Sequence, residues 1–167
     1  MAVKKLFLAL LVIAVACAAT SAVAWDPAKQ KDLGQDSVKM QWYLLDYDTK
    51  EGEIPFVIVR KYYTNEKIKN DTIELLMSKF SITPEVAGSL YFTEYEYEYT
   101  KDGKQFTVAY QRHYDMLGNE VHGTVYDDAS EATKKVFYNV SDSFAAGKSK
   151  DFAMPKPAPA KAPARRT

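Results

Sequence analysis

The feature that most constrains this chain is a run of alternating tyrosine and glutamate between Tyr91 and Thr100, YFTEYEYEYT. Alternation with a period of two residues is typical of a β-strand whose two faces differ in chemistry. The run ends in the segment KDGK, and a second β-prone run follows it. Because Asp-Gly between two such runs is the strongest short-range hairpin signal, the sequence predicts a hairpin closed by a two-residue type I′ turn.

A two-residue turn fixes the register of the predicted hairpin. The expected pairs on an aromatic face are Tyr99–Phe106, Tyr97–Val108, Tyr95–Tyr110 and Tyr91–Tyr114, and those on a polar face are Glu98–Thr107, Glu96–Ala109 and Glu94–Gln111. This sorting favours tyrosines in the core and a solvated ladder of glutamates on the other face. The alternative is a recognition surface of exposed tyrosines, since tyrosine is enriched at protein interfaces.

The rest of the chain predicts more strands and two helices. Strands are expected over Val38–Tyr47, Phe56–Tyr63 and Glu120–Tyr126, which brings the antiparallel meander to about five strands. Apolar residues at helical spacing predict an inserted helix over Asp71–Phe80, or from Glu66, with Asp71 and Glu74 at capping-box spacing.

A second helix is expected over Asp128–Ala146, again with capping-box spacing at its start and with Gly147 placed to end it. This C-terminal helix should pack on the aromatic face of the sheet. The fold class predicted from these elements is α+β, with a single domain.

The N-terminus has the pattern of a secretory signal peptide. Lys4 and Lys5 precede an apolar run of eleven residues, and small residues follow at positions 22–24. The run is shorter than the roughly 20 residues needed to span a bilayer. We therefore expect cleavage before Trp25 and no transmembrane span in the mature chain. The alternative is lipidation at Cys17, because the preceding Ala-Val-Ala resembles a lipoprotein box.

Cys17 is the only cysteine, so a chain cleaved before Trp25 has none. Disulfides, thiolate zinc sites and cysteine nucleophiles are then excluded, and the core must hold the domain together. The predicted organisation is a signal peptide over 1–24, a loose segment over 25–36, a folded domain over 37–147 and a disordered basic tail over 148–167, rich in Pro, Ala and Lys.

Charge is unevenly distributed along the chain. Residues 25–146 carry a net charge of about −7, whereas residues 147–167 carry about +5. An acidic body argues against a nucleic-acid partner, because phosphate binding requires a basic face. The tail is either an inert solubilising segment or a tether to the anionic cell envelope.

The segment YFTEYEYEYTKDGKQFTVAYQRHYDMLGNEVHG resembles the small secreted surface-adhesin E family of Gram-negative-type bacteria. The residues that carry the resemblance are Phe106, Tyr110, Arg112, Tyr114, Asp115, Gly118, Asn119 and Val121, with a strand around Trp42. The resemblance implies an exported α+β domain with a curled antiparallel sheet and a role in host-matrix adhesion. It carries no catalytic motif, and no family binding residue is transferred to this chain.

The two histidines give an alternative. If the second hairpin turns symmetrically about Leu117-Gly118, His113 and His122 lie directly opposite each other, and Glu94, Glu96 and Gln111 share their face. Two imidazoles and the Glu94 carboxylate would suit a metal ion or haem. A three-residue loop with a glycine bulge would separate the two histidines, which would then be ordinary surface residues near a turn.

The chain has no glycine-rich phosphate loop, no HExxH and no G-x-S-x-G motif, so we expect a non-enzymatic protein without a cofactor. The leading hypothesis is an exported bacterial cell-envelope or surface protein, periplasmic or on the outer surface, that binds protein or matrix ligands. Its expected binding residues are Glu94, Glu96, Glu98 and Arg112. The alternatives are a periplasmic metal- or haem-binding protein and a structural envelope protein.

Overall fold

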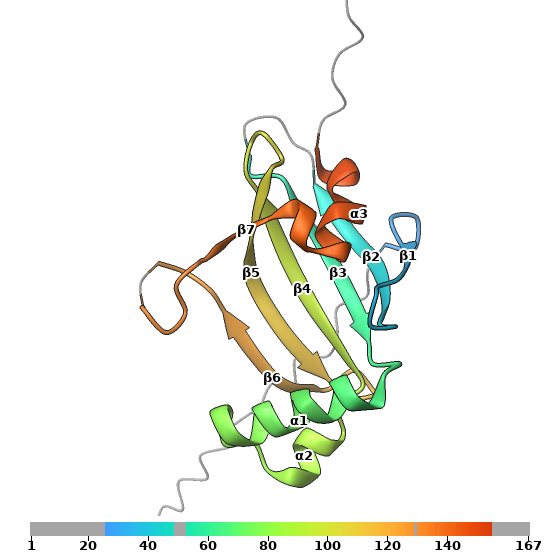
Figure 1. Ribbon diagram of the computed structural model, residues 1–167, viewed down its shortest axis with the longest axis vertical. Helices are drawn as coiled ribbons and strands as arrows, with labels where there is room; N and C mark the ends of the chain where they lie inside the picture. The colour runs from blue at the N-terminus through green and yellow to red at the C-terminus, as the bar shows by residue number, and fades with distance from the viewer. Residues whose placement is uncertain (1–25, 49–52, 129, 155–167) are drawn as a thin grey trace, which may run out of the picture.

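The computed structural model describes residues 26–48, 53–128 and 130–154 of the 167-residue chain. Six strands follow one another in chain order across a curled antiparallel sheet, and a short seventh strand pairs with β5 (Figure 1). The strands are β1 Lys31–Gln35, β2 Gln41–Asp48, β3 Phe56–Tyr62, β4 Phe92–Tyr99, β5 Gln105–Tyr114, β6 Glu120–Val125 and β7 Phe137–Asn139. The helices are α1 Glu66–Phe80, α2 Pro84–Gly88, the 3₁₀ turn η1 Val140–Asp142 and α3 Phe144–Ala153. The predicted α+β domain with a meander sheet, an inserted helix and a C-terminal helix on the sheet is confirmed.

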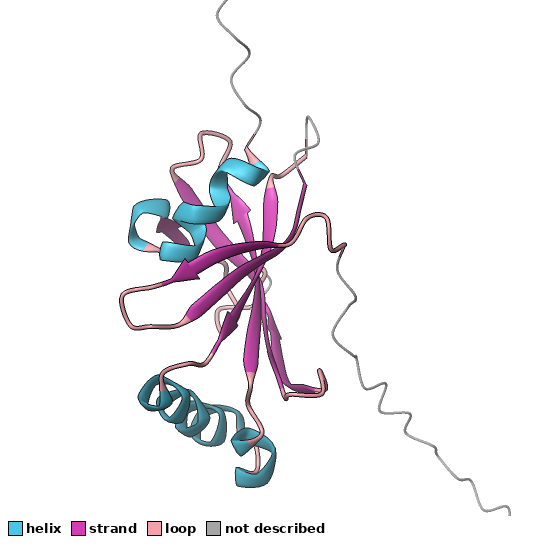
Figure 2. Ribbon diagram, turned by 90° about the vertical axis from the view of Figure 1, so that its right-hand side faces the viewer, coloured by secondary structure: helices cyan, strands magenta, loops and turns pink. Residues whose placement is uncertain are grey.

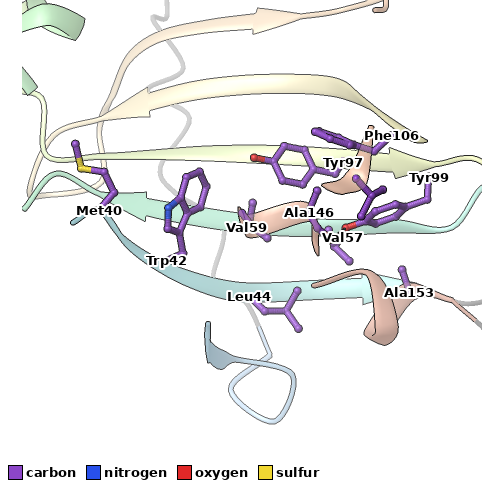
Figure 3. Close-up of a cluster of buried hydrophobic side chains, with 12 residues drawn as sticks. Met40, Trp42, Leu44, Val57, Val59, Tyr97, Tyr99, Phe106, Ala146 and Ala153 are labelled. Atoms are coloured by element: carbon purple, nitrogen blue, oxygen red, sulfur yellow. Dashed lines mark hydrogen bonds between the residues drawn. The ribbon is translucent and has the colours of Figure 1, made fainter. Parts of the chain in front are cut away.

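The main hydrophobic core lies on the face of the sheet that α3 covers, which we call the helix face (Figures 2 and 3). The sheet contributes buried side chains such as Leu44, Val59 and Tyr97, and α3 contributes Ala145, Ala146 and Ala153. Small side chains on the buried side of α3 let its backbone approach the sheet closely. Burial of this apolar surface is the main force that stabilises the domain.

A hydrogen bond also fixes α3 to the sheet. The Tyr99 hydroxyl donates to the Ala146 carbonyl at 2.9 Å and lies 3.0 Å from Ser149 Oγ. Tyr99 comes from β4, and its ring is only 3% exposed. The prediction that hairpin tyrosines belong to the core is therefore confirmed for Tyr97 and Tyr99.

The apolar stripe predicted for α1 is confirmed. Leu76 is fully buried in a second, smaller core cluster, against which Ile73, Met77 and Phe80 pack. The predicted capping box at Asp71 is wrong, because the helix begins at Glu66. Asn65 is the N-cap residue, and its side-chain oxygen accepts from the backbone N–H groups of Lys67 and Ile68.

The predicted helix over Asp128–Ala146 is wrong in its bounds. Backbone hydrogen bonds instead join Asp127 to Thr133 and Lys135 to Asp127, and the described residues 127, 128 and 130–135 are not helical. β7 then pairs with the beginning of β5 beyond the end of β6, and the helix starts only at Phe144 after the N-cap Ser143. Gly147 consequently lies inside α3. Pairing with a distant strand has overridden the local helical pattern.

The folded part also extends further than predicted at both ends. The segment 25–36, predicted to be loose, contains β1, which pairs with β2 and has a bulge at Leu33, next to Gly34 with its positive φ. At the other end, α3 continues to Ala153, within the range assigned to the tail. The signal peptide over 1–24, Cys17 and tail residues 155–167 lie outside the described residues.

The β4–β5 register is confirmed near the turn and wrong beyond it. Tyr99 pairs with Phe106, Glu98 with Thr107 and Tyr97 with Val108, but Glu96 pairs with Tyr110. Ala109 is therefore an extra residue in β5, a β-bulge. As a result Tyr110, Arg112 and Tyr114 lie on the glutamate face, whereas Gln111 and His113 lie on the tyrosine face.

The turn itself is not type I′. That turn requires a positive φ at Asp102. Among the described residues only Lys39 and Ser81 are non-glycine residues with positive φ, while Gly103 has a φ of 63°. The Asp102 carboxylate instead accepts from the Lys104 N–H and the Thr100 hydroxyl inside the loop.

The Tyr99 hydroxyl provides a test of how α3 is held. We expect Tyr99→Phe to lower the free energy of unfolding by about 1 kcal/mol, because the Ala146 carbonyl loses its donor from the sheet. Urea denaturation monitored by circular dichroism would measure the change. Tyr91→Phe removes a hydroxyl at a position that is 44% exposed and belongs to neither core cluster, so it is the matched control and should leave stability unchanged. Equal effects of the two substitutions would contradict this role for Tyr99.

Candidate functional site

On the face of the sheet opposite α3 the described part of the chain places no helix, and we call it the open face (Figure 2). Beyond the β5 bulge, two rows of paired residues cross this face from strand to strand. One row is Tyr43, Arg60, Glu94 and Arg112, and the other is Gln41, Tyr62, Phe92 and Tyr114. The open face therefore combines aromatic rings with charges of both signs.

A buried ion pair lies at the centre of the open face. Arg60 Nε and Nη2 both donate to Glu94 Oε1, at 3.1 and 2.5 Å, and the Glu94 side chain is only 2% exposed. Arg60 Nη1 also donates to the Tyr62 hydroxyl at 3.2 Å. The guanidinium carbon lies 4.2 Å from the centre of the Phe92 ring, a cation–π contact. Arg60 is thus held from three directions.

A groove of about 500 Å³ opens on this face beside Arg60. Its lining includes Tyr43, Tyr62, Tyr91, Arg60, Gln41 and Thr64. The three tyrosines form a chain of edge-to-face contacts, with centroid distances of 5.7 Å between Tyr43 and Tyr62 and 5.6 Å between Tyr62 and Tyr91. The volume lies within the usual range for ligand pockets, and aromatic walls with a few polar groups are their usual lining. We call it the Arg60 groove.

The predicted binding residues occupy different environments on this face. Glu94 is 1% exposed, so the prediction that it belongs to a solvated ladder is wrong. Glu98 is ion-paired with Lys135 at 2.6 Å, and Arg112 lies with its guanidinium carbon 4.8 Å from the Tyr110 ring centre. Burial, together with the nearby Glu98 charge, raises the pKa of Glu96. None of these four side chains lines the Arg60 groove.

The residues that do line the groove were missed by the sequence analysis. The available signal was Arg60 within the β-prone run FVIVRKYY, where it shares a strand face with Ile58 and Tyr62. A single arginine on an otherwise apolar strand face requires a partner, because burying an unpaired charge is costly. Glu94 is that partner, but it lies 34 residues further along the chain.

Of the two arrangements left open for the histidines, the structure has the one in which they face each other. His113 lies opposite His122, and their rings are stacked with centroids 6.4 Å apart. The turn is not symmetric about Leu117-Gly118, however, because the backbone of Asp115 pairs with that of Asn119. A second bulge, at Val121, compensates for this displacement and restores the pairing of the histidines.

The surroundings of the histidines do not form the predicted metal site. Glu94 lies on the open face, whereas His113 and His122 lie on the helix face with Thr93. His113 Nδ1 lies 2.9 Å from the Thr93 hydroxyl, and His113 Nε2 lies 2.9 Å from the Gln111 amide nitrogen, so both ring nitrogens have protein partners. No group of three or more metal-ligating His, Cys, Asp or Glu side chains occurs within the described ranges.

The histidines instead belong to a packed cluster at the α1 end of the helix face. Thr93 links His113 to the Tyr63 hydroxyl at 2.8 Å, and the His122 ring lies 4.0 Å from that of Phe80 in α1. Burial, with the nearby Lys61 and His122, lowers the pKa of His113 to about 3. His113 is therefore a neutral core residue at physiological pH.

Comparison of the chain with protein-family models, with curated proteins and with solved structures gives no match. In the part of the chain that the structure describes, no helix has the length and apolar character needed to cross a membrane.

The Arg60–Glu94 pair can be tested by substitution. We expect Glu94→Gln to destabilise the domain by about 3 kcal/mol, because it leaves the Arg60 charge buried without its counter-ion. Urea denaturation would measure the change in unfolding free energy. Glu53→Gln, at an exposed position between β2 and β3, is the matched control and should have little effect. A loss for Glu94→Gln no larger than that of the control would show that the pair is not a structural unit.

The low pKa of His113 predicts a dependence of stability on pH. Its pKa is about 3 in the folded state and 6.5 ordinarily, so between these values the unfolded chain binds the extra proton. The contribution of neutral His113 to the free energy of unfolding is fully present above pH 6.5. It is lost as the pH falls towards 3, by at most about 1.4 kcal/mol per pH unit. Unfolding free energies measured from pH 7 to pH 4 would show this slope.

Substitution assigns that slope to His113. His113→Gln should make the pH dependence shallower, because the titrating group is gone. Gln111→Asn perturbs the same hydrogen-bonded cluster without removing a titrating group, and should retain the slope. Identical slopes for the original chain and His113→Gln would contradict the assignment.

Proposed function

We propose that this chain is an exported bacterial cell-envelope or surface protein that binds a protein ligand through the Arg60 groove and performs no catalysis. The observation that carries the proposal is the composition of a helix-free sheet face: a fixed arginine beside three tyrosines in a groove of about 500 Å³. Arginine and tyrosine are among the side chains that supply most of the binding energy at protein interfaces.

The groove is organised before a ligand arrives. Arg60 is held by Glu94, Tyr62 and the Phe92 ring, so little side-chain entropy remains to be lost on binding. Tyr91 is 44% exposed at the edge of the groove and offers its ring to a partner. Because Glu94 already balances the Arg60 charge, the groove favours a neutral aromatic or polar segment of a protein over a strongly charged one.

Export and an adhesin-like role rest on the sequence. The N-terminal pattern is that of a signal peptide, and the segment from Leu90 to Gly123 resembles the surface-adhesin E family. Extracellular-matrix proteins are therefore the first ligands to test. Arg112, Glu96 and Glu98, on the same face as the groove, would contact the outer part of such a ligand.

The basic end of the chain would tether the protein to the anionic envelope. Lys104, Lys148 and Lys150 line a hollow between the β4–β5 turn and α3, and four more basic residues follow in 155–167. Attraction of this kind is nonspecific and weakens with salt. It would hold the protein near the cell surface but would not determine its ligand specificity.

Binding to immobilised collagen, fibronectin and laminin tests the proposal. Residues 25–167 should be retained by at least one of these proteins at physiological salt, and Tyr91→Ala should weaken retention by roughly tenfold or more, the loss typical of an interface hot spot. Surface plasmon resonance would measure the dissociation constants. Val86→Ala, 45% exposed on α2 outside the groove, is the matched control and should bind normally.

Two outcomes would overturn the proposal. Retention that is equal for Tyr91→Ala and Val86→Ala would exclude the Arg60 groove. Retention that needs residues 155–167 and disappears at high salt would show charge attraction alone. Protease treatment of intact cells, followed by mass spectrometry of released peptides, tests export separately: release of peptides from residues 37–147 while periplasmic markers stay protected would place the domain outside.

A further inference from the structure

A second groove, of about 270 Å³, lies on the helix face and is lined almost entirely by aromatic and aliphatic side chains. We call it the tyrosine groove. Its lining includes Tyr95, Tyr97, Phe106, Val108, Tyr126 and Tyr138. Tyr138 in β7 is 48% exposed, and Val136 just before it is 53% exposed. One wall of the groove is therefore apolar surface that α3 leaves uncovered.

The tyrosine groove also contains unused hydrogen-bonding groups. The hydroxyls of Tyr95, Tyr126 and Tyr138 make no hydrogen bond to any residue that the structure describes. By contrast, Tyr99, which is covered by α3, donates to Ala146. The groove thus presents flat rings together with free phenol donors, a lining that suits a ligand with apolar rings and exposed carbonyl acceptors.

A proline-rich segment has this chemistry. Proline offers a flat apolar ring and a carbonyl acceptor but no N–H donor, and proline-rich segments in the polyproline II conformation dock into aromatic-lined grooves. Because the conformation is already restricted in the free segment, binding costs little entropy. This chain supplies such a segment itself: residues 155–167 read PKPAPAKAPARRT.

We propose that the tyrosine groove binds residues 155–167 of the same molecule. The described chain ends at Met154, whose side chain lies against Gly103 in the β4–β5 turn. From Gly103, β5 leads to Phe106 and Val108 in the groove, a distance of about 17 Å at 3.3 Å per residue. A segment of 13 residues spans about 40 Å in the polyproline II conformation, so its prolines can reach the groove.

Charge does not explain this contact. Residues 155–167 carry four basic side chains and no acidic one, and Lys134 lines the groove. The contact must therefore come from the prolines and the tyrosine rings. This separates the inference from the envelope tether, which depends on the basic side chains, and from the Arg60 groove, which lies on the opposite face of the sheet.

Paramagnetic relaxation in solution tests the proposal on residues 25–167. A nitroxide attached through Ala160→Cys would be the only label, because residues 25–167 contain no cysteine of their own. We expect loss of amide signal intensity at Phe106–Val108 and Val136–Tyr138, with signals of β1 retained. Replacing the four prolines (Pro155→Ser, Pro157→Ser, Pro159→Ser and Pro163→Ser) should abolish the loss. Replacing the four basic residues (Lys156→Gln, Lys161→Gln, Arg165→Gln and Arg166→Gln) should not.

A matched pair of substitutions in β7 tests the groove. Tyr138→Ser removes a ring from the tyrosine groove and should restore the signals of Phe106–Val108. Phe137→Ser removes a ring of similar exposure from the opposite face of the same strand and should leave the intensity loss in place. Persistence of the loss in Tyr138→Ser, or its absence in the original chain, would overturn the proposal. Isotope-labelled molecules without a nitroxide can also be mixed with nitroxide-bearing ones. The same signal loss on the nitroxide-free molecules would assign the groove to a second copy and overturn self-binding.

Discussion

The composition of the two faces of the β4–β5 hairpin depends on one extra residue in β5. The bulge at Ala109 moves every later side chain of the strand to the other face, so Arg112 and Tyr114 join Glu94 on the open face and His113 joins the helix face. Without it, the two faces of this hairpin would have the composition that simple alternation predicts. A bulge also bends its strand and increases the local twist, which fits the curled sheet. The Ala109 carbonyl is used as well, as it accepts from Tyr126 at 2.8 Å and ties the end of β6 to the bend.

Local features were predictable from the sequence, whereas features set by distant pairing were not. The apolar stripe of α1 and the first pairs of the β4–β5 hairpin follow from spacing alone, and both are confirmed. The bulges at Ala109 and Val121 carry no glycine that would mark them. The sequence left open whether the two histidines pair. They do so although the turn is not symmetric, because the displacement in the turn and the Val121 bulge cancel.

The same reasoning accounts for the ends of the domain and for the candidate site. β1 is a polar edge strand, and the residues before α3 pair with β5, so in both places a contact between distant segments decides the structure. The Arg60 groove draws its lining from β2, from β3 and from neighbouring residues outside the strands, among them Tyr91 just before β4. Its location could not be predicted until the order and register of these strands were known. Glu94 was predicted from the sequence to be a solvated binding residue, whereas its side chain is buried in an ion pair with Arg60.

The proposed function gives the Arg60–Glu94 pair a role that stability alone does not require. Forming a buried ion pair costs free energy because both charges must leave water. Apolar side chains of similar volume at the same positions therefore often stabilise a fold equally well or better. What the pair provides is a guanidinium fixed in position beside three tyrosine rings, on the face that no helix covers. The helix face has a different character: its charges are few, and α3 and α1 shield most of its aromatic residues. The helix face therefore contains the main core of the fold, and the proposed function assigns ligand binding to the open face.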